Sequence, residues 1–304
     1  MQMKIGLPKA LLYYRYGALW ETFFRELGFD VEVSPDTNKD MLTRGMRNTL
    51  DENCLSLKIF MGHVHWLIGK CDQILVPRFA RTGKAEEFCV RFWGLPDLVK
   101  NTFPAVPILS YNLNTRGHRT EASAFIRMGQ ALGKSRQDCF HAYCAGCRAQ
   151  ENLNQQNVLA QREQMHTGCR KVLIASQPYL IHDAYMGGQL QKILLRQGAT
   201  PLFSDRYCRR LCRAFSNEIS TDLYWTLNKE MIGAIELYQN QVDGIILLTA
   251  FPCGSDSLVN ELVLRKVHSV PMIQILLDEH TSPTGLETRI ESFMDILSQR
   301  RPYA

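Results

Sequence analysis

Short runs rich in apolar residues alternate along the first third of the chain with longer segments of helical periodicity. The runs that fit buried strands lie at residues 3–7, 31–33, 73–76 and 106–109. The segments with helical periodicity lie between them, at 14–27, 41–49 and 55–68. Strands separated by helices of this length are typical of a parallel sheet, so this part of the chain is predicted to be an α/β unit.

The same alternation returns after residue 170. Strand-like runs are found at 171–175, 244–249 and 272–277, and helical segments at 185–197, 255–266 and 286–300. Between the two parts, the sequence lacks strand signals and predicts helices at 121–132 and 150–166, with a cysteine-bearing turn between them. The predicted architecture is two parallel-sheet α/β halves, residues 1–115 and 171–304, joined by a helical bridge of residues 116–170. We expect the functional site in the cleft between the halves, because ligands bind beyond the carboxyl ends of parallel strands.

Length and composition narrow the class of protein. A chain of 304 residues is long enough for two compact units, and 45% hydrophobic with 21% charged residues excludes a disordered or fibrous protein. The net charge of +5 is mild for this length and argues against nucleic-acid binding. No secretory signal and no apolar run of about 18 residues is visible, so we expect a soluble, cytoplasmic protein without a membrane segment.

The ten cysteines are the most informative feature of the composition. They are Cys54, Cys71, Cys89, Cys139, Cys144, Cys147, Cys169, Cys208, Cys212 and Cys253. Cytoplasmic proteins do not retain disulfides, and a chain of this size folds without them. Ten thiols also exceed what packing requires, which indicates metal or redox chemistry.

Three of these cysteines, Cys54, Cys89 and Cys253, lie in loops or at helix starts on the predicted site edge. Cys253 comes just before a helix that Ser255 or Asp256 would cap, where the helix dipole favours a thiolate. Gly254 would let a ligand or cluster approach the backbone. Three thiolates with one open position suit a site-differentiated iron–sulfur cluster or, less well, a zinc ion with one exogenous ligand. Three unrelated buried cysteines are the alternative.

A second group, Cys139, Cys144 and Cys147, has the spacing C-x4-C-x2-C. This spacing matches the first three ligands of a plant-type [2Fe–2S] loop, although the helical context differs from that fold. A zinc half-site with His141 or His166 is another interpretation. Loop or packing cysteines are the remaining alternative.

Asp278, Glu279 and His280 follow the strand-like run at 272–277 and could orient a ligand or transfer a proton. Capping and turn formation is the alternative role for them. The chain has neither a Walker-type phosphate loop nor a convincing G-x-G-x-x-G motif, so we do not expect it to hydrolyse ATP itself.

Several of these segments together resemble a known family. They are residues 5–14, 51–55, 89–97, 248–257 and 277–281, with 284–285 and 288–289 after them. The resemblance is to acyl-CoA dehydratase activase-related proteins, relatives of the iron–sulfur component of 2-hydroxyacyl-CoA dehydratases. It runs from about residue 3 to residue 297.

This resemblance implies a [4Fe–4S] cluster held by Cys54, Cys89 and Cys253, and electron transfer from an ATP-dependent activase or another electron donor. It also implies a CoA thioester as candidate substrate, with the chain acting as a lyase-type or reductase component of an oxygen-sensitive system. Related double-cubane proteins use more cysteines, which leaves open a second cluster at Cys139, Cys144 and Cys147. Both homo- and hetero-oligomers are compatible with the sequence. The rival hypothesis is a non-catalytic, zinc-stabilised α/β module that binds a small ligand or a partner protein.

Overall fold

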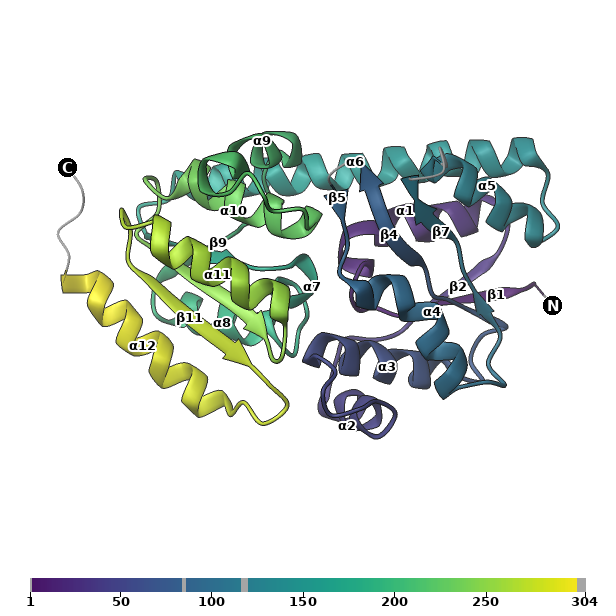
Figure 1. Ribbon diagram of the computed structural model, residues 1–304, viewed down its shortest axis with the longest axis horizontal. Helices are drawn as coiled ribbons and strands as arrows, with labels where there is room; N and C mark the ends of the chain where they lie inside the picture. Colours follow the sequence, from purple (N-terminus) through teal and green to yellow (C-terminus); the bar gives the residue numbers. More distant parts are fainter. Residues whose placement is uncertain (1, 84–85, 116–119, 300–304) are drawn as a thin grey trace. The chain divides into compact units, whose positions relative to one another are not determined.

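The computed structural model describes residues 2–83, 86–115 and 120–299 and divides into two compact units. Unit 1 is Met1–Gln155 and unit 2 is Gln156–Ala304, and each is described by itself (Figure 1). The three-part division expected from the sequence stays a prediction. Its first boundary adjoins residues 116–119, which lie outside the described ranges.

Unit 1 is built on a four-stranded parallel sheet. The strands are β1 (Lys4–Leu7), β2 (Asp30–Val33), β3 (Gln73–Leu75) and β6 (Ile108–Leu109), in the order β2-β1-β3-β6. The helices that connect them are α1 (Tyr13–Glu26), α2 (Lys39–Arg47), α3 (Leu55–Leu67) and α4 (Val90–Thr102). This arrangement confirms the prediction of a parallel α/β unit.

A second, three-stranded sheet in unit 1 was not predicted. It consists of β4 (Arg78–Gly83), β5 (Glu86–Glu87) and β7 (Asn112–Asn114), with β4 in the middle. β4 carries two arginines, a threonine and a glycine, so it lacks the apolar run by which buried strands are recognised. Its buried residue is Phe79, whose ring lies 5.2 Å from that of Phe88 and 5.7 Å from that of Tyr111. The position of β4 in the fold is therefore fixed by the packing of the Phe79 ring against these two aromatic side chains.

The prediction of a cysteine-bearing turn near residue 140 is wrong. After α5 (Glu121–Ala131), one helix of 30 residues, α6 (Arg136–Met165), runs through this region and carries the boundary between the units (Figure 1). Its glycine, Gly146, packs against α1, where an added Cβ would lie 2.7 Å from the carbonyl oxygen of Leu19. A single glycine costs a helix only about 1 kcal/mol, and here it permits close packing instead of ending the helix.

Two buried glutamines fasten α6, one in each unit. In unit 1, Gln150 Oε1 accepts a hydrogen bond from the backbone N–H of Leu19 at 3.4 Å. In unit 2, the fully buried Gln161 pairs with both backbone groups of Phe203, at 2.9 Å and 2.7 Å. At these two positions α6 is attached by hydrogen bonds from buried amides, where a packed amphipathic helix ordinarily has apolar side chains.

Unit 2 repeats the parallel pattern. Its strands are β8 (Arg170–Ala175), β9 (Ala199–Phe203), β10 (Gly244–Ala250) and β11 (Met272–Leu277), in the order β11-β10-β8-β9. Its helices are α7 (Pro178–Ile181), α8 (Gly187–Arg196), α9 (Arg209–Ile219), α10 (Thr226–Tyr238), α11 (Gly254–Lys266) and α12 (Pro283–Gln299). The sequence predicted the strands at 171–175, 244–249 and 272–277 but not β9, α9 or α10. Residue 300 of the predicted closing helix lies outside the described residues.

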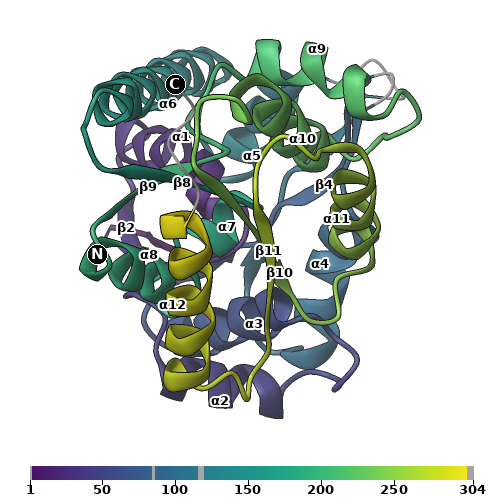
Figure 2. The ribbon, with the colours of Figure 1, turned by 90° about the vertical axis from the view of Figure 1, so that its left-hand side faces the viewer.

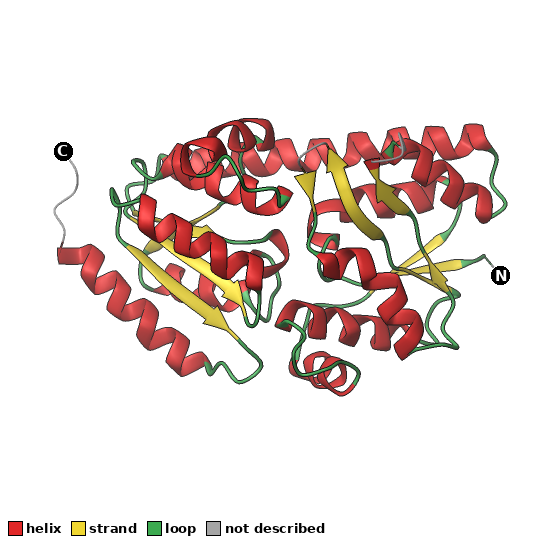
Figure 3. Cartoon of the chain, viewed as in Figure 1, coloured by secondary structure: helices red, strands yellow, loops and turns green. Residues whose placement is uncertain are grey.

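Helices cover both faces of the sheet of unit 2, as Figures 2 and 3 show. On one face, Leu173 and Ile245 of the sheet share a buried cluster with Met231 of α10 and Val259 of α11. On the other, the rings and methyl groups of α12 reach Gly244, which an added Cβ would bring within 2.8 Å of Phe293. Burial on both faces explains why β10 is buried along its whole length and is mostly apolar. Among the described residues, no helix is long and apolar enough to cross a membrane.

Candidate functional site

The three cysteines predicted as ligands share one local position. Cys54, Cys89 and Cys253 are the N-cap residues of α3, α4 and α11. The sequence analysis had assigned the cap of α11 to Ser255 or Asp256, and this assignment is wrong. An N-cap side chain lies beside the unpaired N–H groups and the positive end of the helix dipole, and this environment favours a thiolate over a thiol.

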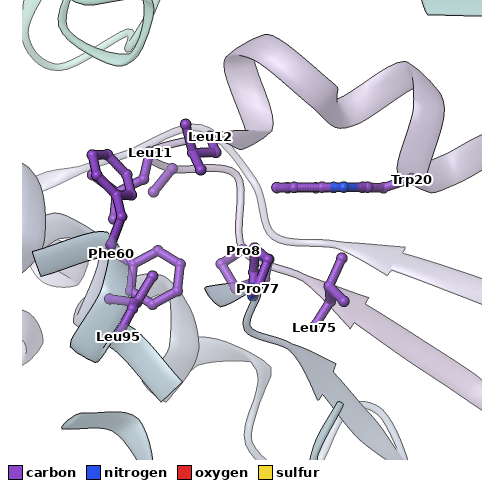
Figure 4. Close-up of a pocket in the computed structure, with 10 residues that line it drawn as sticks. Pro8, Leu11, Leu12, Trp20, Phe60, Leu75, Pro77 and Leu95 are labelled. Carbon is purple, nitrogen blue, oxygen red and sulfur yellow. The ribbon is translucent and has the colours of Figure 1, made fainter. Parts of the chain in front are cut away.

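In unit 1, α3 and α4 contact one another, and each begins at a half-buried cysteine. Together with the β1–α1 loop, they surround an apolar cavity of about 10 Å³, room for about one water molecule (Figure 4). Its lining includes Pro8 after β1, Pro77 after β3, Phe60 of α3 and Leu95 of α4. β1 and β3 are the neighbouring strands from which the chain departs in opposite directions, the place where α/β sheets bind ligands.

The loop that carries Cys54 is held by a buried ammonium group. Lys58, 2% exposed, donates a hydrogen bond from Nζ to the carbonyl oxygen of Asp51 at 2.9 Å. Sequence analysis missed this residue. The available signal was a lysine at the fourth position of a mostly apolar helix, since lysine is rarely fully buried without a polar partner.

His63, also on α3, joins this helix to the end of β2. Its Nδ1 lies 2.7 Å from Ser34 Oγ and its Nε2 lies 2.8 Å from Thr37 Oγ1. Burial lowers the pKa of His63 to about 4, so the imidazole is neutral at physiological pH. The sequence gave no reason to single out this histidine, because its partners come from another element.

α4 is fastened by a bidentate ion pair. Both guanidinium nitrogens of Arg78 bond to the Asp97 carboxylate at 2.7 Å, and one of them also bonds to the carbonyl oxygen of Trp93. The hydrogen bonds from Arg78 lower the pKa of Asp97. Because Arg78 lies on β4 and Asp97 on α4, the pair fixes the helix that begins at Cys89.

In unit 2, Cys253 is half-buried and follows β10, next to β8 at the point where this sheet reverses its strand order. Asp256 Oδ1 accepts hydrogen bonds from Gln177 Nε2 and Asn228 Nδ2, each at 2.8 Å. The Cys253 side chain is hydrogen-bonded to the same carboxyl group, and burial raises the pKa of Asp256. Ser255 Oγ lies 3.5 Å from Cys253 Sγ.

Asp278, Glu279 and His280 follow β11, which neighbours β10, so they lie at the same edge of the sheet as Cys253. Asp278 Oδ1 accepts hydrogen bonds from Thr281 Oγ1 at 2.7 Å and from the backbone N–H of His280 at 3.0 Å. Glu279 is half-buried and His280 is exposed. The Asp278 carboxylate therefore forms a turn, and a proton-transfer role for the three residues stays a prediction.

The cysteines of α6 do not face one another as a set. Cys139 is fully buried against Gly129, where an added Cβ would lie 2.3 Å from its sulfur. Cys144 and Cys147 are half-buried, and Cys147 is hydrogen-bonded to Tyr143. Five residues of helix turn Cys144 well away from Cys139. Over residues 2–83, 86–115 and 120–299, no group of three or more His, Cys, Asp or Glu side chains is arranged to hold a metal ion.

A family model matches more than half of the chain. The model described as CoA enzyme activase uncharacterised domain (DUF2229) matches residues 4–206, which is 203 of the 304 residues (206 − 4 + 1). The chain belongs to this family. The matched part of the chain contains Cys54, Cys89 and the cysteines of α6. Cys253 lies beyond it.

No curated protein matches this chain. Among solved structures, ZnuA shares 10% identity over 97% of this chain and 99% of its own, with a TM-score of 0.28. A carbohydrate transporter from Acidothermus cellulolyticus 11B, in complex with myo-inositol, shares 9% identity over 90% of this chain and 74% of its own, with a TM-score of 0.23. An FpvC mutant from Pseudomonas aeruginosa shares 10% sequence identity over 98% of this chain and 100% of its own, with a TM-score of 0.26. Scores this low support no argument about function.

Proposed function

We propose that this CoA enzyme activase-related protein binds a [4Fe–4S] cluster through Cys54, Cys89 and Cys253. In this role it accepts low-potential electrons from an ATP-dependent activase and acts on, or passes electrons toward, a CoA thioester. The observation that carries the proposal is that all three cysteines occupy helix N-caps, two of them on α3 and α4, which contact each other. Membership in a family described as a CoA enzyme activase domain supports the proposal that an activase is the electron donor.

The residues fit such a group chemically. Thiolates are the soft ligands that iron–sulfur clusters take, and a helix N-terminus stabilises the thiolate form. An added Cβ at Gly254 would meet no atom of the described residues within 4 Å, so the backbone beside Cys253 leaves room for a bulky group. When bound, a cluster with three protein thiolates supplies one-electron transfer and one iron open to an exogenous ligand.

The chain's own residues would position the ligand cysteines and the molecule that binds next to them. Lys58 fixes the loop that precedes Cys54, and Arg78 fixes α4 behind Cys89. At the sheet edge of unit 2, His280 is exposed. Asp278 holds the turn that presents it.

Anaerobic reconstitution with iron and sulfide tests the proposal. The reconstituted chain is expected to be brown and to hold about four iron and four sulfide per chain, the content of one cubane. Cys253→Ser should lose most of the iron, because a hard hydroxyl replaces a soft thiolate. Cys71→Ser and Cys212→Ser are the matched controls and should leave the iron content unchanged. Fewer than two iron per chain in the parent protein would rule the proposal out.

The second candidate is a zinc-stabilised binding module, because the same cysteine thiolates are also ordinary ligands of zinc. A colourless protein with about one zinc per chain, removed by chelators together with part of the stability, would support it. Metal analysis of the protein purified without added metal separates the two candidates.

A further inference from the structure

His182 and Asp205 form a hydrogen-bonded pair in unit 2 that the proposed function does not use. His182 Nε2 lies 2.8 Å from Asp205 Oδ2, and the two side chains are 20% and 18% exposed. His182 is the C-cap residue of α7, which follows β8, and Asp205 comes two residues after β9. β8 and β9 are neighbouring parallel strands. The pair therefore lies at the carboxyl edge of the sheet, the edge at which α/β folds bind ligands.

The two ring nitrogens of His182 have different environments. Burial opposes the charge on Asp205, but the charges of His182 and two neighbouring arginines outweigh it and lower the pKa of this carboxyl group. An ionised carboxylate only accepts hydrogen bonds, so Nε2 carries the proton that is donated to Asp205. In the neutral imidazole, Nδ1 is then the basic nitrogen. Nδ1 has no hydrogen-bond partner among the described residues and is not fully buried, so a ligand can reach it.

The second oxygen of Asp205 argues against a purely structural pair. Over residues 2–83, 86–115 and 120–299, Oδ1 is buried and has no hydrogen-bond partner. An unpaired buried carboxylate oxygen costs stability, and most buried polar side chains are satisfied. Departures from this rule are expected at functional sites. The hydrogen bonding of the Asp205 side chain to described residues is thus confined to His182.

The loops after β8 and β9 are joined to each other and to α6. Ser204 Oγ donates to the carbonyl oxygen of Ser176 at 3.1 Å, which links the first residue after each strand. Gln161 Nε2 of α6 donates to the carbonyl oxygens of Phe203 and Arg206, at 2.9 Å and 3.2 Å. These bonds hold the carboxylate and the imidazole in one geometry, which proton transfer to a bound molecule requires.

We propose that His182 and Asp205 form an acid–base dyad. Asp205 holds the Nε2–H, and Nδ1 takes a proton from a hydroxyl, thiol or other protic group of a small molecule bound at this edge of the sheet. The carboxylate stabilises the imidazolium that forms, and the proton then returns to the ligand or to water. A Ser-His-Asp triad orients its imidazole in the same way, with the two ring nitrogens exchanged. The dyad goes beyond the proposed function and needs no cluster.

The position of the ring proton is measured by 15N NMR of the full chain without added metal, with His182→Gln to assign the signals. Neutral His182 should carry its proton on Nε2. In Asp205→Asn the new amide can donate to Nε2, so the proton should move to Nδ1. A parent protein in which neutral His182 is protonated on Nδ1 would overturn the proposal.

The reactivity of Nδ1 separates a dyad from a structural pair. Diethyl pyrocarbonate modifies neutral imidazoles, and mass spectrometry follows each histidine at a pH above which the rates no longer rise. His268, exposed in the same unit, is the internal reference. His182 should be modified at least as fast as His268, although it is mostly buried. Asp205→Asn should slow the modification of His182 about tenfold, in the range that loss of a group orienting an imidazole costs.

Asp243→Asn is the matched control. Asp243 accepts a hydrogen bond from the backbone N–H of Lys171 at 2.7 Å, at the opposite edge of the same sheet. This variant should leave the modification of both histidines unchanged.

A structural pair predicts the opposite effect of Asp205→Asn, because His182 without its partner would be more exposed and would be modified faster. Faster or unchanged modification of His182 in Asp205→Asn would therefore overturn the proposal. So would a parent protein in which His182 reacts more slowly than His268, a comparison that needs no variant. Since all these measurements use the chain without added metal, they decide the role of His182 whether or not a cluster is bound.

Discussion

His63 Nδ1 lies 2.7 Å from Ser34 Oγ, and this contact ties α3, the helix that begins at Cys54, to the end of β2. The second ring nitrogen is bonded to Thr37, so both nitrogens are used inside the protein. The imidazole is fully buried, and the charged form has no water around it. Protonation of His63 would therefore destabilise the contacts that hold α3, so the stability of this part of the candidate site should depend on pH.

The free energy of unfolding should fall in acid because of His63. Its pKa is about 4 in the folded chain and about 6.5 when unfolded, so the unfolded state binds more protons between these values. The contribution is complete above about pH 6.5 and declines as the pH falls toward 4, by about 3 kcal/mol in total. Urea unfolding at pH 7, 5.5 and 4 measures it. His63→Gln should reduce this pH dependence, and an unchanged slope in the variant would contradict the assignment.

Lys58→Met should destabilise the loop before Cys54. Methionine fills the same space but cannot donate to the Asp51 carbonyl oxygen. Loss of a hydrogen bond from a charged donor is expected to lower the free energy of unfolding by about 1–3 kcal/mol. Lys100→Met, on the exposed side of α4, is the control and should change it by less than about 0.5 kcal/mol. Faster alkylation of Cys54 in Lys58→Met alone would identify the loop as the part that loosens.

Gly146→Ala and Gly94→Ala should have opposite effects, although both glycines lie inside helices. At Gly146 the added Cβ would lie 2.7 Å from the carbonyl oxygen of Leu19, so α1 and α6 must separate. We expect a loss of about 1–3 kcal/mol. At Gly94 the Cβ meets no described atom within 4 Å, and alanine should add about 0.5–1 kcal/mol by helix propensity. The unfolding temperatures of both variants measure these effects. A Gly146→Ala variant more stable than the parent protein would show that α6 does not pack on α1 in this way.

The cysteines should separate into fast and slow classes when the metal-free chain is alkylated. Cys169 and Cys208 are exposed and should react first. Cys139 and Cys212 are buried, and burial raises the pKa of Cys212 to about 12, so both should react slowly while the chain is folded. Mass spectrometry of a time course gives the order. Rapid labelling of Cys139 would mean that α6 opens in this region, and a second metal site there would then regain support.

Much of the parallel α/β architecture could be read from the sequence because apolar runs and helical periodicity are local. The runs at 3–7, 171–175 and 244–249 became β1, β8 and β10, and Gly28 ends α1 with a φ of +77°. The helix starts after Cys54 and Cys253 were also visible, whereas Cys89 was placed in a loop and the helix that follows it, α4, was not predicted. These features depend on residues within about one helical turn of each other.

Tertiary structure alone decided the rest. β4 and β9 lack strong strand signals and are defined by the strands beside them. The turn expected at Cys139–Cys147 lies within α6, whose Gly146 packs against α1. The network of Gln177, Asn228 and Asp256 joins residues up to 79 positions apart. The sequence by itself therefore determined, through local patterns, the parallel α/β units and the candidate site residues. The partners that hold the Cys54 loop and His63 in place were decided by long-range packing, which leaves no periodic trace in a single sequence.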